Sequence, residues 1–239
     1  MPIKSVTFEN ENYEISYEII NPSCSKDIVF LHGWGSNKDI MKTAFSKYLP
    51  SFRHIYIDMP GFGKSPTNHI LTTSKYISLI DNFLEKLSSD KFIIAGHSYG
   101  GKIATSLNPK NLVLLSSAGI LEEKSASTKR KIFFAKLFKS LGLGFLTKSF
   151  RSKDVDNMDE NMYETFKNVL NEDYSSNFSS YNGNALIFWG EKDTATSLDS
   201  GKKISNLIKK STFVSYDGDH YFFLKNSKDI AERIENGIL

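Results

Sequence analysis

FIIAGHSYGGK, residues 92–102, is the stretch of sequence that decides the fold prediction. Its first four residues, 92–95, are apolar or small and predict a buried strand that runs toward Ser98. Gly96 and Gly100 flank this serine, and glycine there would relieve strain in a tight turn from strand to helix. The same pattern is the G-x-S-x-G nucleophile elbow, in which the serine lies on a sharp turn above a sheet. Because so short a motif recurs by chance, the rest of the chain has to decide between the two interpretations.

Length and composition favour one soluble α/β domain with an insertion. The chain has 239 residues, of which 40% are hydrophobic and 24% are charged. A net charge of +3 is too small to imply nucleic-acid binding. Residues 1–16 have no apolar core of signal-peptide length, and no apolar run approaches the ~20 residues that cross a bilayer. We therefore expect a cytoplasmic protein without a transmembrane segment and without nucleic acid as a partner.

Cysteine and histidine usage gives no sign of a metal site. Cys24 is the only cysteine, so it cannot form an internal disulfide. No cluster of cysteine and histidine has the spacing of metal ligands. We therefore expect neither a metal nor an organic cofactor.

Short apolar runs alternate with helical patterns along the chain. Two alternating segments, residues 3–8 and 12–20, predict an antiparallel hairpin. Six runs rich in branched and aromatic residues predict strands buried on both faces of a parallel sheet, at residues 28–31, 55–57, 92–95, 112–115, 185–189 and 212–215. Apolar residues at helical spacing predict helices over residues 74–88, 198–209 and 226–237. The sequence therefore predicts an α/β fold with an eight-stranded, mostly parallel sheet and helices on both faces.

The alternation of strands and helices breaks between residues 120 and 180, and this region divides by charge. Residues 121–153 carry nine basic and two acidic side chains, whereas residues 154–173 carry seven acidic and one basic. An insertion at this place with helical periodicity predicts a cap over the carboxyl edge of the sheet, where open α/β sheets bind ligands. We expect residues 120–180 to form this helical cap, or lid, and the core to comprise residues 1–119 and 181–239.

A glycine-containing motif, FLHGWGSN at residues 30–37, follows the third predicted strand. It is either a plain loop in which His32 satisfies local hydrogen bonds, or half of an oxyanion hole. In the second interpretation the backbone N–H of Trp34 acts together with that of Tyr99, the residue after the nucleophile. A further motif, YIDMPGFGKS at residues 56–65, predicts a rigid turn that shapes the floor of the site. We expect five residues to shape the site around the serine: His32, Gly33, Gly96, His97 and Gly100.

Two more motifs follow the last two predicted strands and supply a base and an acid. WGEKDT contains Asp193 and YDGDHYFF contains His220. A serine hydroxyl is a weak nucleophile unless a histidine takes its proton, and that histidine needs a carboxylate to fix its tautomer. The order Ser98, Asp193, His220 is that of an α/β-hydrolase triad. Glu191 is the nearest rival to Asp193 as the acid.

With these motifs in this order, the chain resembles the α/β-hydrolase superfamily of serine hydrolases over nearly its whole length. HGWG, DMPGFGKS and a basic cap look most like the carboxylesterases that cleave pimeloyl-acyl-carrier-protein methyl ester in biotin synthesis. The chain also resembles the meta-cleavage-product hydrolases, which cut a carbon–carbon bond but typically carry a small residue where Trp34 stands. Serine at the elbow argues against the haloalkane dehalogenase branch, which uses a carboxylate there.

The resemblance implies three functions that the sequence leaves open. The first is a carboxylesterase that forms an acyl-enzyme on a small or carrier-bound acyl ester, such as pimeloyl-acyl-carrier-protein methyl ester. The second is a carbon–carbon bond hydrolase that uses the same triad. The third is a ligand-binding receptor on a hydrolase scaffold.

A basic amphipathic segment, residues 129–146, opens the predicted cap with Lys129, Arg130 and Lys131. Its charges are either simply solvated above a buried apolar face, or they meet an acidic partner. An acyl carrier protein is such a partner, being an acidic helical domain. An anionic membrane is the competing partner, because a basic amphipathic helix is also typical of membrane surfaces.

Overall fold

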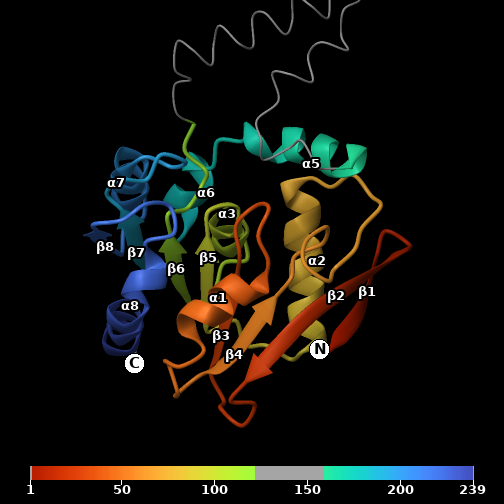
Figure 1. Cartoon of the computed structure of the whole chain (residues 1–239), viewed down its shortest axis with the longest axis horizontal. Coiled ribbons are helices and arrows are strands. Elements are labelled where there is room, and N and C mark those ends of the chain that lie inside the picture. The colour runs from red at the N-terminus through yellow and green to blue at the C-terminus, as the bar shows by residue number, and fades with distance from the viewer. Residues whose placement is uncertain (1, 122–158, 239) are drawn as a thin grey trace, which may run out of the picture.

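An eight-stranded sheet organises the chain in the computed structural model, which describes residues 2–121 and 159–238 (Figure 1). The strand order is β1-β2-β4-β3-β5-β6-β7-β8. β1 (Ile3–Phe8) and β2 (Glu11–Ile20) form an antiparallel hairpin, and β2 continues antiparallel to β4. The six remaining strands are mutually parallel: β3 (Asp27–Leu31), β4 (Arg53–Ile57), β5 (Ile93–His97), β6 (Asn111–Leu115), β7 (Asn184–Gly190) and β8 (Ser211–Tyr216). The predicted mostly parallel sheet of eight strands is confirmed.

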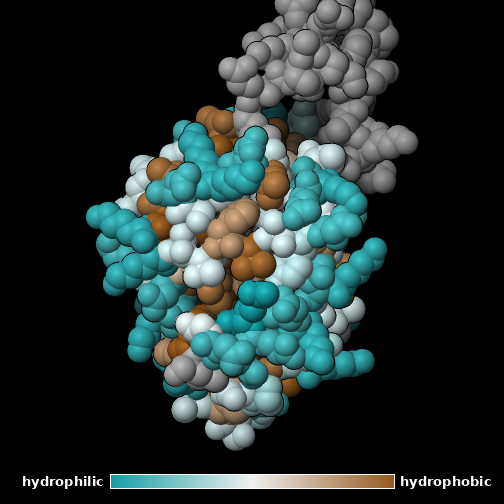
Figure 2. All heavy atoms as spheres, turned by 90° about the vertical axis from the view of Figure 1, so that its left-hand side faces the viewer, coloured by the Kyte–Doolittle hydropathy of each residue, from teal (hydrophilic) through white to brown (hydrophobic). Residues whose placement is uncertain are grey.

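Burial along the strands explains their sequence patterns. Every residue of β3, β5 and β6 is buried, which is why these strands are nearly continuous apolar runs. In β1 only Val6 is buried, between exposed neighbours, which is the period of 2 that a half-exposed strand requires. β8 is the last strand of the sheet and forms one edge. Figure 2 shows the molecule from the side of β8, α7 and α8, and this face is mostly hydrophilic around a smaller apolar area. Such side chains limit pairing of an edge with other chains.

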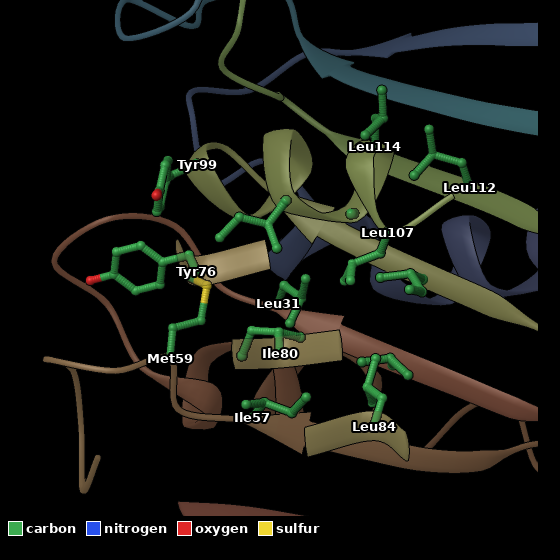
Figure 3. Close-up of a cluster of buried hydrophobic side chains, with 14 of the residues drawn as sticks. Leu31, Ile57, Met59, Tyr76, Ile80, Leu84, Tyr99, Leu107, Leu112 and Leu114 are labelled. Carbon is green, nitrogen blue, oxygen red and sulfur yellow. The ribbon is translucent and has the colours of Figure 1, made fainter. Parts of the chain in front are cut away.

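Helices cover both faces of the sheet (Figure 1). One face is covered by α1 (Lys38–Phe45) and α8 (Phe223–Ile238), whose Phe45 and Phe223 belong to a core cluster with Phe30 of β3. The other face is covered by α2 (Thr73–Lys86), α3 (Tyr99–Ser106) and α7 (Leu198–Leu207). In Figure 3, Ile80 and Leu84 of α2 lie against the strand residues Leu31 and Ile57. The helices predicted over 74–88, 198–209 and 226–237 therefore correspond to α2, α7 and α8.

Two helices follow the undescribed stretch and precede β7, namely α5 (Glu160–Leu170) and α6 (Ser175–Ser180). α5 lies on the side to which the central strands point (Figure 1). The loop before α2 binds it, because the Leu71 N–H donates to Thr165 Oγ1 (2.9 Å) and Asn161 Nδ2 donates to the Asn68 carbonyl (2.8 Å). α6 contacts α3 and α7 of the core. We propose that residues 120–180 form the cap, of which the structure describes residues 120–121 and 159–180.

Residues 2–121 and 159–238 include no helix whose length and apolar character would allow it to cross a membrane.

Candidate active site

Ser98 lies at the junction of β5 and α3 in a strained backbone conformation. Its φ of 50° and ψ of −116° are rare for a residue with a side chain. The turn is held by hydrogen bonds from the Ser98 N–H to the Leu115 carbonyl (3.1 Å) and from the Ala118 N–H to the Ser98 carbonyl (3.0 Å). A Cβ at Gly96 would lie 2.4 Å from the carbonyl oxygen of Gly100, so these two glycines allow the helix to start this close to the strand. The strand, turn and helix expected of the elbow are therefore present.

Asp193 and His220 meet beyond the ends of β7 and β8. His220 Nδ1 and Asp193 Oδ2 are 2.7 Å apart, and the Asp193 side chain is fully buried whereas that of His220 is 16% exposed. Asp193 Oδ1 accepts from the N–H groups of Ala195 (2.8 Å) and Thr196 (2.9 Å), and Oδ2 also accepts from Thr196 Oγ1 (3.0 Å). Burial alone would raise the pKa of Asp193, but the hydrogen bonds from His220 and Thr196 outweigh burial and lower that pKa to about 2. The carboxylate therefore stays ionised and accepts the Nδ1 proton of His220, which leaves Nε2 free to act as a base.

Glu191, the rival acid, has another partner. Its Oε1 accepts a hydrogen bond from Ser215 Oγ (2.8 Å) at an exposed position. The geometry therefore pairs His220 with Asp193.

His97 supports the loop that carries His220. His97 Nε2 donates to the His220 carbonyl (3.0 Å), and the two ring centroids are 4.6 Å apart. Burial, and then the charge of His220, lower the pKa of His97 to about 3. His97 is therefore neutral at physiological pH and acts on the site through its contact with His220.

The loop with Trp34 lines the same cavity as Ser98 and Tyr99. Within the described residues, neither the Trp34 N–H nor the Tyr99 N–H donates to a protein acceptor. Tyr99 is the first residue of α3, where an unpaired N–H is inherent to a helix start. The Trp34 ring packs edge-on against Phe62 (4.8 Å) and Tyr99 (5.6 Å) and at a tilt against Phe166 of α5 (5.2 Å). These contacts fix the loop beside the start of α3.

His32 joins this loop to the one that follows β4. The Met59 N–H donates to His32 Nε2 (3.1 Å), so Nδ1 carries the proton and donates to the Gly33 carbonyl (2.7 Å). Burial lowers the pKa of His32 to about 4. His32 thus makes the local hydrogen bonds expected of a loop residue, and it also orients Gly33. A Cβ added at Gly33 would lie 2.9 Å from His97 Nδ1, so only glycine fits there without a shift of its neighbours.

A buried ion pair lies beneath the same loop. Lys38 Nζ and Asp58 Oδ2 are 2.6 Å apart, and each side chain is 1% exposed. Asp58 also accepts from the N–H groups of Lys38 (2.8 Å) and Lys64 (3.0 Å). Burial would raise the pKa of Asp58, but these bonds from Lys38 and Lys64 hold it below its usual range. The predicted rigid turn at 56–65 is thus tied to the start of α1, directly after the Trp34 loop.

Replacing Asp58 by asparagine should lower the free energy of unfolding at pH 7 by about 3–5 kcal/mol, because Lys38 would stay buried without its counter-charge. Since folding lowers the pKa of Asp58, its contribution is complete above the unfolded pKa of 3.8 and is lost as pH falls below that value. Urea unfolding between pH 7 and pH 3 measures both effects. Asp39→Asn is the control, because Asp39 is exposed and follows Lys38 on α1. It should change stability far less, and an equal loss in the two variants would contradict the prediction.

The candidate residues converge on one cavity of about 830 Å³. Ser98, His220, Trp34 and Tyr99 line it. Apolar side chains of α5 and of the segment after β6 form much of the remaining wall: Ile120, Leu121, Phe166, Val169 and Leu170. Within the two described ranges, no three His, Cys, Asp or Glu side chains cluster in a way that could hold a metal ion. Lys129, Arg130 and Lys131 lie outside the described residues.

Two cavity residues, Lys102 and Glu172, were not predicted. They form an ion pair with a Nζ–Oε2 distance of 2.6 Å. Burial lowers the pKa of Lys102, and the bond to Glu172 opposes that effect. Lys102 could have been noticed as the residue one helical turn after Ser98, but nothing in the sequence pairs it with Glu172.

Known proteins support the fold independently. A family model for the α/β-hydrolase fold matches residues 27–142. A serine hydrolase-like protein of Danio rerio is 30% identical over 117 residues, which are 45% of this chain and 36% of that protein. A pimeloyl-[acyl-carrier protein] methyl ester esterase of Legionella pneumophila (strain Corby) is 36% identical over 80 residues, which are 34% of this chain and 30% of the esterase. The chain thus matches about a third of each relative's length.

Solved structures extend the similarity over the whole chain. A thermophilic esterase from Thermogutta terrifontis superposes with a TM-score of 0.72 over 99% of this chain and 98% of the esterase. The two sequences are 16% identical, so this likeness concerns the fold alone.

Proposed function

We propose that this chain, which has the α/β-hydrolase fold, is a serine carboxylesterase that works through an acyl-enzyme. The observation that carries the proposal is the convergence of Ser98, the His220–Asp193 pair and two unpaired backbone amides on one cavity. A nucleophile, an oriented base and a pair of oxyanion donors are what acyl transfer requires.

In the proposed mechanism, Ser98 Oγ attacks the ester carbonyl while His220 Nε2 takes its proton. The amides of Trp34 and Tyr99 stabilise the oxyanion of the tetrahedral intermediate, and His220 then gives the proton to the leaving alcohol. Water activated by His220 hydrolyses the acyl-enzyme in the second half of the reaction. Asp193 holds the histidine tautomer and stabilises the imidazolium in both halves.

For the substrate we propose an acyl ester carried by an acyl carrier protein, with a small soluble ester as the alternative. The match to a pimeloyl-[acyl-carrier protein] methyl ester esterase supports this class. The predominantly apolar cavity wall is suited to an acyl chain. Residues 121–153, with nine basic side chains, supply the charge that an acidic carrier would meet.

A substrate panel tests the proposal. It contains p-nitrophenyl acetate, a methyl ester bound to an acyl carrier protein and a dienoate diketo acid. We expect a burst of p-nitrophenol, followed by slower turnover as the acyl-enzyme hydrolyses, and cleavage of the carrier-bound ester. Turnover of the diketo acid alone would favour a carbon–carbon bond hydrolase, and binding without turnover would favour a receptor.

Reversing Lys129, Arg130 and Lys131 to glutamate should raise the KM for the carrier-bound ester and leave the KM for a small soluble ester unchanged. Opposite charges speed encounter with an acidic partner, and salt screens exposed charges beyond ~8 Å at physiological ionic strength. The measurement is steady-state kinetics on both esters at low and high salt. Equal losses on both esters would indicate a damaged cap, and no change on either would mean that the charges are merely solvated.

A further inference from the structure

The wall of the cavity contains a buried lysine one helical turn after Ser98. Lys102 lies four residues along α3, about 6 Å along the helix axis. Its side chain is 2% exposed, and Nζ donates to Glu172 Oε2 (2.6 Å) and to the Val169 carbonyl (2.7 Å). The ammonium also lies 4.8 Å from the centre of the Tyr174 ring. The charge of Lys102 is therefore neutralised by the protein itself.

Glu172 is the less buried partner of this pair. Its side chain is 31% exposed and lines the cavity. Oε2 accepts from both Lys102 and Thr73 Oγ1 (2.5 Å), and Tyr99 OH in turn donates to Thr73 Oγ1 (3.3 Å). Oε1 has no hydrogen-bond partner among the described residues. The network thus fixes the carboxylate in place and leaves one oxygen as an acceptor.

This acceptor stands in a mostly apolar surrounding. Phe166, Val169 and Leu170 precede it on α5 and line the same cavity. The rings of Trp34 and Tyr99 also line this cavity, and Trp34 packs against Phe166. In such a surrounding a charged acceptor binds an O–H or N–H donor more strongly than in water, and it disfavours a second negative charge. If an acyl chain occupies this cavity, Glu172 would therefore favour a hydroxyl or N–H group on that chain over a carboxylate.

We propose that Glu172 is a specificity-determining residue that favours acyl groups bearing a neutral hydrogen-bond donor, a hydroxyl or an amide N–H, over acyl groups that end in a free carboxylate. Lys102 pairs with the Glu172 carboxylate and offsets its charge, and Thr73 Oγ1, which donates to the same oxygen, holds the carboxylate in place when Lys102 is replaced. The inference rests on the proposed esterase function and adds the substrate class of the same site.

The test compares p-nitrophenyl esters of three acids of matched length: heptanoic acid, 6-hydroxyhexanoic acid and adipic acid with its second carboxyl free. For each variant, kcat/KM on each ester is divided by the value for p-nitrophenyl acetate. The wild type should prefer the hydroxyl ester to the carboxylate ester. In Glu172→Gln the ratio of these two values should fall about tenfold or more, because a charged acceptor is lost and Lys102 remains as a net positive charge. In Lys102→Met, which leaves Glu172 as a net negative charge, the ratio should not fall.

Glu164→Gln is the matched control, since Glu164 lies on α5, pairs with Lys167 and does not line the cavity. Its ratio should stay within about twofold of the wild type. An unchanged ratio in Glu172→Gln, or an equal fall in Lys102→Met, would overturn the inference, because the charge of Glu172 would then not be the cause. Absence of acetate hydrolysis in the wild type would overturn the proposed function, and the inference with it.

Discussion

Ser98→Ala should lower kcat for p-nitrophenyl acetate about 10⁴-fold or more, which leaves only the rate supplied by substrate binding and the oxyanion amides. The alanine has no oxygen to attack the ester, so no acyl-enzyme forms and the burst of p-nitrophenol should disappear. Thermal melting should change little, because the Ser98 backbone makes the hydrogen bonds that hold the turn.

Ser106→Ala is the control for this experiment, since Ser106 ends the same helix and does not line the catalytic cavity. A fluorophosphonate probe should label the wild type and Ser106→Ala, but not Ser98→Ala. If Ser98→Ala keeps near-normal ester hydrolysis or is labelled by the probe, another residue is the nucleophile.

The sheet was predictable because its central strands are buried on both faces. The resulting runs, such as those at 28–31 and 112–115, contain almost no polar residue and are short enough to exclude helices. α1 was not predicted, because a helix of eight residues shows hardly two turns of apolar periodicity. Its position depends on the buried partner Asp58, which the local sequence does not reveal.

The candidate site was predictable where its residues directly follow strands. Ser98, Asp193 and His220 each lie just beyond a strand of a parallel sheet, so the topology brings them to one edge. Long-range pairs were not predictable, because charged residues that become buried look like surface residues in the sequence. Lys102 and Glu172 are 70 positions apart, and Glu172 belongs to a run of acidic residues that indicates only a solvated surface.

Asp193→Asn should lower kcat about 10⁴-fold, because the amide would hold His220 in the wrong tautomer. Asp193 Oδ1 accepts from two backbone N–H groups, so the asparagine would keep its carbonyl oxygen in that position. Its NH₂ group would then replace Oδ2 and donate to His220 Nδ1, which is 2.7 Å away. The proton of the neutral imidazole would move to Nε2, and His220 could no longer accept the proton of Ser98.

The matched control is Glu191→Gln, two residues away and bonded to Ser215 rather than to His220. We expect this variant to keep nearly full kcat on p-nitrophenyl acetate. In Asp193→Asn, activity should rise only at high pH, where hydroxide can replace His220 as the base. In the wild type Asp193, whose pKa is lowered to about 2, stays ionised over the mildly acidic range, so its titration should not shape the pH profile there. If Asp193→Asn is silent while Glu191→Gln loses activity, the acid that orients His220 is Glu191, and the bond between His220 and Asp193 serves the fold alone.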